Sequence, residues 1–229
     1  MSMPTKDLAA LVPERVTWLR AAVSSIPLVG SAFDHLLFDK ADAIRLRNLE
    51  TALKALSNQV QQLDAQQIQK DWFASEEALS AFKVMADKVS YEPDSKKIDA
   101  MGRIIAACGT QQHFKDQRKL SVVEHLGRLS HTQMKLLQAL VRTPARQKRI
   151  DLAGLEQTVT AIWASDFTKT LKAGPHFWTG KLKLYEELEI LESYNTIKRA
   201  LVMVGPSEAG YVVTKIGKQA ASYVSTAGL

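Results

Sequence analysis

The densest group of chemically active side chains in the sequence is a basic segment, Arg142-Thr-Pro-Ala-Arg-Gln-Lys-Arg149, which has four cations and no acid in eight residues. Guanidinium and ammonium groups bind phosphate oxygens, so this segment indicates an anionic partner. Residues 110–149 carry nine basic and two acidic side chains, while the flanking regions are nearly balanced. A solvated connector between helices would have the same composition, and no aromatic residues are interleaved for stacking on bases. Both interpretations stay open.

A nucleic-acid interface would combine this segment with two cations of a predicted β-hairpin further along the chain. The six residues are Arg142, Arg146, Lys148, Arg149, Lys198 and Arg199. The helix predicted before that hairpin, over residues 181–192, is acidic through its second half. Base edges in DNA are read mainly by cationic or amide side chains, so this helix favours protein contacts over sequence-specific recognition of DNA.

A second candidate segment is the apolar run from Ile26 to Phe38, which Asp34 and His35 interrupt. It is shorter than the roughly 20 residues that span a bilayer, so it predicts no transmembrane helix. We interpret it as a core-lining turn between two helices, with a membrane-inserting hairpin as the alternative. The residues that would contact a membrane or a partner are Ile26, Leu28, Val29, Phe33, Leu36, Leu37 and Phe38.

Sequence motifs of catalysis and metal binding are missing. The five histidines are scattered, and the single cysteine, Cys108, lies among apolar residues typical of a core. The chain has neither a Gly-x-Ser-x-Gly elbow nor a Gly-x-x-x-x-Gly-Lys-Ser/Thr phosphate loop. We therefore expect no enzyme activity, no cofactor and no metal. The charged first residues predict no signal peptide, and so a cytoplasmic protein.

The elements that must position these residues are mainly helices, since 46% of the residues are hydrophobic and only 7% are aromatic. Leucines and Val60 recur at alternating three- and four-residue spacing from Leu46 to Leu63, which predicts a long helix whose seam packs within the chain, with a homodimer left open. Further helices are predicted to begin at Ser75, Ser121 and Ser130.

Two further helices and a loop are predicted in the rest of the chain before residue 181. A helix over residues 98–108 is predicted to end at Gly109 in the left-handed conformation. Asp151 is predicted to cap a helix that carries Leu152, Leu155, Val159, Ile162 and Trp163 on one face. Residues 164–179 are predicted to form a loop, with His176-Phe-Trp178 as an aromatic plug.

Residues 181–224 have a different order of elements: a leucine-rich helix, a polar turn, a hairpin of 199–204 with 211–214, and a closing helix over 215–224. The first helix ends Leu188-Glu-Ile-Leu-Glu192, and Tyr211-Val-Val-Thr-Lys-Ile-Gly217 precedes the last helix. With these motifs the segment resembles winged-helix domains. It departs from them in a long insert that contains Gly174 and Pro175.

The whole layout is similar to prokaryotic helical proteins of the abortive infection alpha type. The similarity is in Ile26-Pro-Leu-Val-Gly30, the long helix from Lys40, and Leu129-Ser130 before Met134-Lys-Leu-Leu-Gln-Ala-Leu140. That resemblance implies a role in phage defence with no assigned active site.

These observations predict a mainly α fold with an N-terminal helical bundle over residues 1–110 and a winged-helix-like module with one β-hairpin over 111–229. The function that we expect is a non-enzymatic binding or regulatory protein that acts through a protein partner, in phage defence. The alternatives are a membrane-active effector that uses residues 26–38 and a regulator that binds DNA non-specifically.

Overall fold

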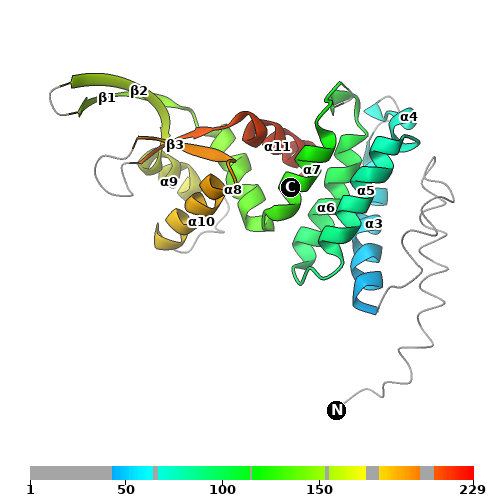
Figure 1. Cartoon of the computed structure of the whole chain (residues 1–229). Coiled ribbons are helices and arrows are strands. Elements are labelled where there is room, and N and C mark those ends of the chain that lie inside the picture. Colours follow the sequence, from blue (N-terminus) through cyan, green and yellow to red (C-terminus); the bar gives the residue numbers. More distant parts are fainter. Residues whose placement is uncertain (1–42, 64–66, 114, 153–154, 174–180, 202–208) are drawn as a thin grey trace, which may run out of the picture. The chain divides into compact units, whose positions relative to one another are not determined.

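The computed structural model describes residues 43–63, 67–113, 115–152, 155–173, 181–201 and 209–229 (Figure 1). These residues are mainly helical, which confirms the predicted fold class at that level. They form two compact units. The first, the N-terminal unit, holds the described residues up to His131 together with Thr226–Leu229, and the second, the C-terminal unit, holds those from Thr132 to Ser225. The compact units thus divide at residues 131–132, and the domain division proposed at 110–111 stays a prediction.

The N-terminal unit is built of helices, with one isolated β-bridge between Ile68 and Thr110 among its described residues. Its elements are α3 (Ala43–Gln62), α4 (Lys70–Phe73), α5 (Glu76–Val89), α6 (Ser95–Cys108), the short 3-10 helix η2 (Gln111–His113) and α7 (Lys119–Arg128). The predicted seam of α3 is buried, with Leu46, Leu49, Leu53 and Leu56 at most 2% exposed. These four leucines therefore pack inside the unit, as predicted for the seam, and a homodimer stays a prediction.

Helix α3 packs closely against α6 at Gly102. A Cβ atom at Gly102 would lie 2.0 Å from the backbone oxygen of Ala52. Only glycine lets the two helices approach so closely, and the approach buries apolar faces that include Leu53 and Ile105. Because folding is driven mainly by such burial, this crossing is the centre of the unit's stability.

Helix starts follow the sequence signals in part. The Oγ atom of Ser75 accepts a hydrogen bond from the Ala78 amide at 3.2 Å, so the predicted cap of α5 is confirmed. The next helix, α8 (His131–Arg142), begins directly after Ser130, also as predicted. The start predicted at Ser121 is wrong, because α7 begins two residues earlier at Lys119, after a turn in which Asp116 accepts from the Arg118 amide.

Gly109 ends α6, but its φ of −85° is not left-handed, so that part of the prediction is wrong. The residue is small for a different reason. A Cβ atom there would lie 2.2 Å from the ring of Phe73, which packs over the end of the helix.

The C-terminal unit joins helices to a sheet. Its elements are α8 (His131–Arg142), β1 (Arg146–Leu152), β2 (Leu155–Trp163), α9 (Ala164–Ala173), α10 (Lys181–Ser193), β3 (Ile197–Leu201), β4 (Gly210–Val213) and α11 (Lys215–Thr226). The strands form one antiparallel sheet in the order β1-β2-β4-β3. The predicted pairing of 199–204 with 211–214 is confirmed in part by β3 and β4, which pair from Ile197 opposite Val213, while residues 202–204 of the predicted first strand lie outside the described residues. The helix predicted over 181–192 is confirmed as α10, and the closing helix as α11.

The prediction of a single β-hairpin is wrong, because β1 and β2 form a second one. Residues 151–152 and 155–163, predicted as part of one helix, lie in these two strands, and residues 146–149 lie in β1 rather than in a loop. Apolar residues three and four apart suggested a helix, yet Thr158, Val159 and Thr160 are β-branched and alternate between exposed and half-buried positions. Such short segments fit both periods, and pairing with a neighbouring strand decides between them.

Three more predictions concern residues 164–173, the proposed aromatic plug and the apolar segment 26–38. Residues 164–173, predicted to be a loop, form α9. The proposed aromatic plug at 176–178 lies outside the described residues, as does the whole apolar segment 26–38 proposed to contact a membrane or a partner. Among the helices that the structure describes, none is both long and apolar enough to cross a membrane.

Candidate protein and nucleic-acid interfaces

The turn between α10 and β3 is locked to the start of α11 by Thr214. The Oγ1 atom of Thr214 lies 2.8 Å from the carbonyl oxygen of Asn195 and 2.9 Å from that of Thr196, and it accepts a hydrogen bond from the Gly217 amide. A Cβ atom at Gly217 would lie 2.1 Å from the Thr196 oxygen, so only glycine fits there. The Thr-x-x-Gly part of the sequence motif therefore fixes the geometry between α10, the sheet and α11.

Helix α10 has one buried and one exposed face. Leu184, Leu188 and Leu191 are at most 3% exposed, and they belong to the core of the unit. The opposite face exposes Glu186 and Glu189 together with Ile190, which is 37% exposed, and Tyr194 just after the helix is exposed to the same extent. Residues 190 and 194 are four apart, so the two apolar side chains are neighbours. We call Glu186, Glu189, Ile190 and Tyr194 the α10 face.

Polar contacts hold α10 in place on both sides. Gln133 of α8 donates from Nε2 to the carboxylate of Glu187 at 2.7 Å. On the other side, the guanidinium of Arg199 lies 2.9 Å from Glu192 and 3.7 Å from Glu189. Arg199 was predicted to bind nucleic acid, but its charge is offset by two carboxylates of α10. Its main contribution is to attach β3 to the helix.

The cations of β1 lie in a different setting. Arg146, Lys148 and Arg149 are exposed. Among the described side chains, their one ion pair is a loose contact of 3.9 Å between Arg146 and Asp166, with the arginine side chain 66% exposed. The Nζ atom of Lys148 lies 4.3 Å above the ring centre of Trp163, an arrangement that leaves the ammonium N–H groups free to reach other acceptors. These three cations are available to an anionic ligand.

Of the six cations predicted from sequence, the structure brings three together on β1 and adds Lys198 at an exposed position on β3. Arg142 is exposed in the last turn of α8, outside the sheet. Sequence reasoning missed Trp163 as the support of Lys148, and missed Ile190 and Tyr194 as exposed apolar residues. The alternation of threonine with apolar residues at 158–161 was the available signal for a strand.

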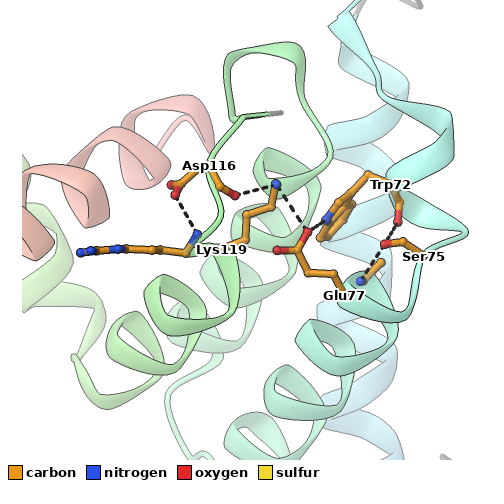
Figure 2. A network of polar contacts seen from close by, with 7 residues as sticks. Trp72, Ser75, Glu77, Asp116 and Lys119 are labelled. Carbon is orange, nitrogen blue, oxygen red and sulfur yellow. Dashed lines mark hydrogen bonds and ion pairs between the residues drawn. The ribbon is translucent and has the colours of Figure 1, made fainter.

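The N-terminal unit contains a polar network of another kind (Figure 2). Lys119 is 3% exposed, and its ammonium donates to the backbone oxygen of Asp116 at 2.8 Å and lies 3.4 Å from the carboxylate of Glu77. Glu77 also accepts from the indole nitrogen of Trp72 at 2.7 Å. The network joins α4, α5 and the start of α7, and all of its named groups are satisfied inside the unit, so it stabilises the bundle.

Burial favours the neutral forms of three other groups in this unit, Cys108, His113 and His125. Burial raises the pKa of the Cys108 thiol far above its usual range, which makes the thiol unreactive. Burial also lowers the pKa of His113 to about 4 and the pKa of His125 below its usual value. Within the part of the chain that the structure describes, no three His, Cys, Asp or Glu side chains gather as metal ligands.

Comparison with known proteins gives no identity for the chain. No protein-family model, no curated protein and no solved structure matches it. The candidate sites of the chain are therefore the two surfaces of the C-terminal unit, the α10 face and the cations of β1 and β3.

Proposed function

We propose that this chain is a non-enzymatic binding protein whose C-terminal unit is a winged-helix-like module that contacts a protein partner through the α10 face. A role in phage defence is part of this proposal on the strength of the resemblance to abortive infection alpha proteins. The membrane-active alternative depends on residues 26–38, outside the described residues, and no further observation favours it.

The order of elements supports the winged-helix-like assignment. Helix α8 is followed by a hairpin, then by α9 and α10, then by β3 and β4, and β4 lies between β2 and β3 in the sheet. The long insert in which the sequence departs from the winged-helix pattern includes α9. This helix lies along the chain between β2 and α10. The Thr214–Gly217 lock joins α10 to the closing helix in the same place as the sequence motif.

The observation that carries the proposed partner class is the composition of the α10 face. In this type of fold the corresponding helix is the one offered to a ligand, and here it presents Glu186 and Glu189 beside Ile190. Carboxylates repel the phosphates of DNA, so the face does not suit a groove. Acidic side chains around exposed apolar ones complement a protein surface that has a small apolar pocket edged by lysine or arginine.

Site-specific photocrosslinking tests this proposal. The full chain is produced in its source cells with benzoylphenylalanine in place of Ile190, and separately in place of Ile44, which is 55% exposed on α3 of the other unit. We expect a discrete protein adduct from position 190 and not from position 44. The adduct should weaken severalfold when Glu186→Gln and Glu189→Gln are added, since the carboxylates would no longer attract a basic rim.

The proposal is wrong if position 190 gives no adduct, or if both positions give the same adducts. Circular dichroism of each variant confirms that the fold is retained. Replacing exposed side chains on a helix surface usually changes the free energy of unfolding by no more than about 0.5 kcal/mol, so loss of the adduct would not reflect loss of structure.

A further inference from the structure

The β1–β2 ribbon, which we define as residues 146–149 and 158–161, is two strands wide. Arg146 pairs with Ala161 and Arg149 with Thr158, while only Ile162 and Trp163 of β2 pair with β4. Figure 1 shows the β1–β2 hairpin extending past β3 and away from α10, while α9 follows directly from the end of β2. Every residue from 146 to 149 is exposed, as are Thr158 and Thr160, whereas Val159 is half-buried and Ala161 is buried.

The two faces of the ribbon both carry cations or hydrogen-bond donors. Side chains alternate along a strand, and paired residues point to the same side. Arg146 and Lys148 share one face with Ala161 and Trp163. The opposite face carries Arg149 and Gln147 with Thr158 and Thr160, the two exposed threonines.

The indole of Trp163 fixes the first face. It is 3% exposed, lies under Lys148, and donates from Nε1 to the backbone oxygen of Arg146 at 3.0 Å. Gly210 on β4 makes room for this ring, because a Cβ atom there would lie 3.3 Å from it and 2.8 Å from the Cβ of Ala161. The core of the sheet thus holds Lys148 and the backbone of Arg146 in a defined position.

The same face continues across the sheet to Lys198. Trp163 is paired with Gly210, Val212 is two residues further on the same side of β4, and Lys198 is paired with Val212. Lys198 is exposed and lies three strand spacings from β1, about 14 Å. Arg199 points to the other side, where Glu192 holds it. The cationic set defined by the structure is therefore Arg146, Lys148, Arg149 and Lys198.

The chemistry of this set fits a polyanion better than a lipid surface. Interfacial membrane binding needs several large apolar side chains that can enter the bilayer. Among the described apolar side chains of this face, Trp163 is buried, Val159 is half-buried and only Val212 is exposed, at 43%. Arginine, lysine, threonine and glutamine are the side chains that contact phosphates and base edges. A two-stranded ribbon fits the roughly 12 Å major groove of B-form DNA, in which a phosphate strand flanks it on each side.

We infer that the β1–β2 ribbon is a second binding site of this protein, one that enters the major groove of duplex DNA and contacts phosphates through cations on both of its faces, with Lys198 touching the backbone beyond the groove. The site is independent of the α10 face, whose carboxylates keep that helix away from the duplex. Four phosphate contacts predict a log-log slope of affinity against salt near −3.6, on the order of a hundredfold loss between 50 and 200 mM salt.

Fluorescence anisotropy of a labelled 20-base-pair DNA duplex with the full chain tests the inference across this range of salt. The test variant carries Arg146→Gln, Lys148→Gln, Arg149→Gln and Lys198→Gln. The matched control replaces four exposed cations elsewhere, Lys83, Lys96, Arg128 and Lys218, by glutamine, so that both proteins have the same net charge. We expect the test variant to lose both its DNA binding and the salt dependence of its affinity. The control should keep a log-log slope of affinity against salt near that of the wild type.

Two further measurements test whether the ribbon enters the major groove and whether it prefers DNA to RNA. Arg149→Gln alone should reduce the slope by about 0.9, as Arg146→Gln does, because each arginine faces one phosphate strand. Duplex RNA should bind at least about tenfold more weakly, since its major groove is too deep and narrow for the ribbon.

The inference is overturned if the wild type does not bind duplex DNA at 50 mM salt, or if the test and control variants bind equally. If duplex RNA binds as tightly as DNA, or if Arg149→Gln leaves the log-log slope of affinity against salt unchanged, the ribbon does not enter the major groove. Binding to phosphatidylserine vesicles but not to DNA would assign the cations to a membrane. If the fourfold variant loses its helical circular dichroism, the single variants carry the test.

Discussion

Lys119 in the N-terminal unit and Lys148 in the C-terminal unit both lie near a tryptophan, but in opposite surroundings. The ammonium of Lys119 is enclosed, donates to Asp116 and pairs with Glu77, which in turn binds Trp72. The ammonium of Lys148 has only the face of Trp163 beneath it and is otherwise exposed. Enclosed charges stabilise their own fold, whereas an exposed charge on a rigid support is free to bind a ligand.

Exposed apolar side chains follow the same division. Of the six large hydrophobic residues exposed in the described part of the chain, four lie in the C-terminal unit: Val141, Ile190, Tyr194 and Val212. Exposed apolar residues grouped beside charges are typical of interaction sites. The difference between the units therefore assigns stability to the first and, under our proposals, binding to the second.

The largest expected effect comes from the closest helix contact in the N-terminal unit. Gly102→Ala places a Cβ atom 2.0 Å from the Ala52 oxygen, so α3 and α6 must separate. We expect a loss of about 3 kcal/mol in the free energy of unfolding, at the upper end of overpacking effects. Urea denaturation followed by circular dichroism measures it.

Gly127→Ala is the matched control for that experiment. Its new Cβ atom would meet only the side chain of Lys88, at 2.8 Å, and that lysine is exposed and can move. Its stability should stay within about 1 kcal/mol of the wild type, since alanine also favours the helix. Equal losses in the two variants would contradict the view that the α3–α6 crossing centres the unit.

A smaller effect is expected at the corresponding glycine of the C-terminal unit. Gly217→Ala moves α11 away from the Thr196 oxygen and strains the Thr214 hydrogen bond, at a cost of about 2 kcal/mol. Because that lock positions α10, the photocrosslink from residue 190 should weaken as well. Lys218→Ala, an exposed change on the same helix, should leave both readouts unaltered. A Gly217→Ala protein with wild-type stability would show that the lock is dispensable.

The smallest expected effect is the acid sensitivity of the N-terminal unit. His113 has a folded pKa of about 4 against 6.5 when unfolded, and its ring shares a 3.0 Å hydrogen bond with Thr226, near Asp116 and Lys119. The unfolded chain takes up the proton first, so the contribution is complete above pH 6.5 and is lost progressively down to pH 4. We expect a loss of about 1–2 kcal/mol between pH 7 and pH 5.

His113→Gln isolates that contribution. The variant should be less stable at pH 7 but should show a weaker fall in its free energy of unfolding between pH 7 and pH 5. Chemical denaturation at the two pH values measures both quantities. If the wild type and the variant have the same pH dependence, His113 is not the group responsible.

Sequence patterns were most reliable where local chemistry decides the structure. The seam of α3, the Ser75 cap and the β3–β4 hairpin each follow from residues close together in the chain, because side-chain spacing, capping and turns act over a few residues. Gly217 was found as part of a motif, yet its purpose, room for the Thr196 oxygen, needed the fold. The α10 face was recognised as acidic, but not as holding exposed Ile190 and Tyr194, since exposure depends on what packs nearby.

By itself the sequence determined that the chain is mainly helical, that its central region is basic and that residues 181–192 form an acidic helix. Only the tertiary structure decided that residues 146–163 pair as strands, because a short segment that fits two periods takes the one whose backbone partner is present. It also decided which cations lie on the same face of the sheet. Strand register aligns Arg146, Lys148 and Lys198 on one face of the sheet. Arg199 lies on the other face, where it forms ion pairs with two glutamates of α10.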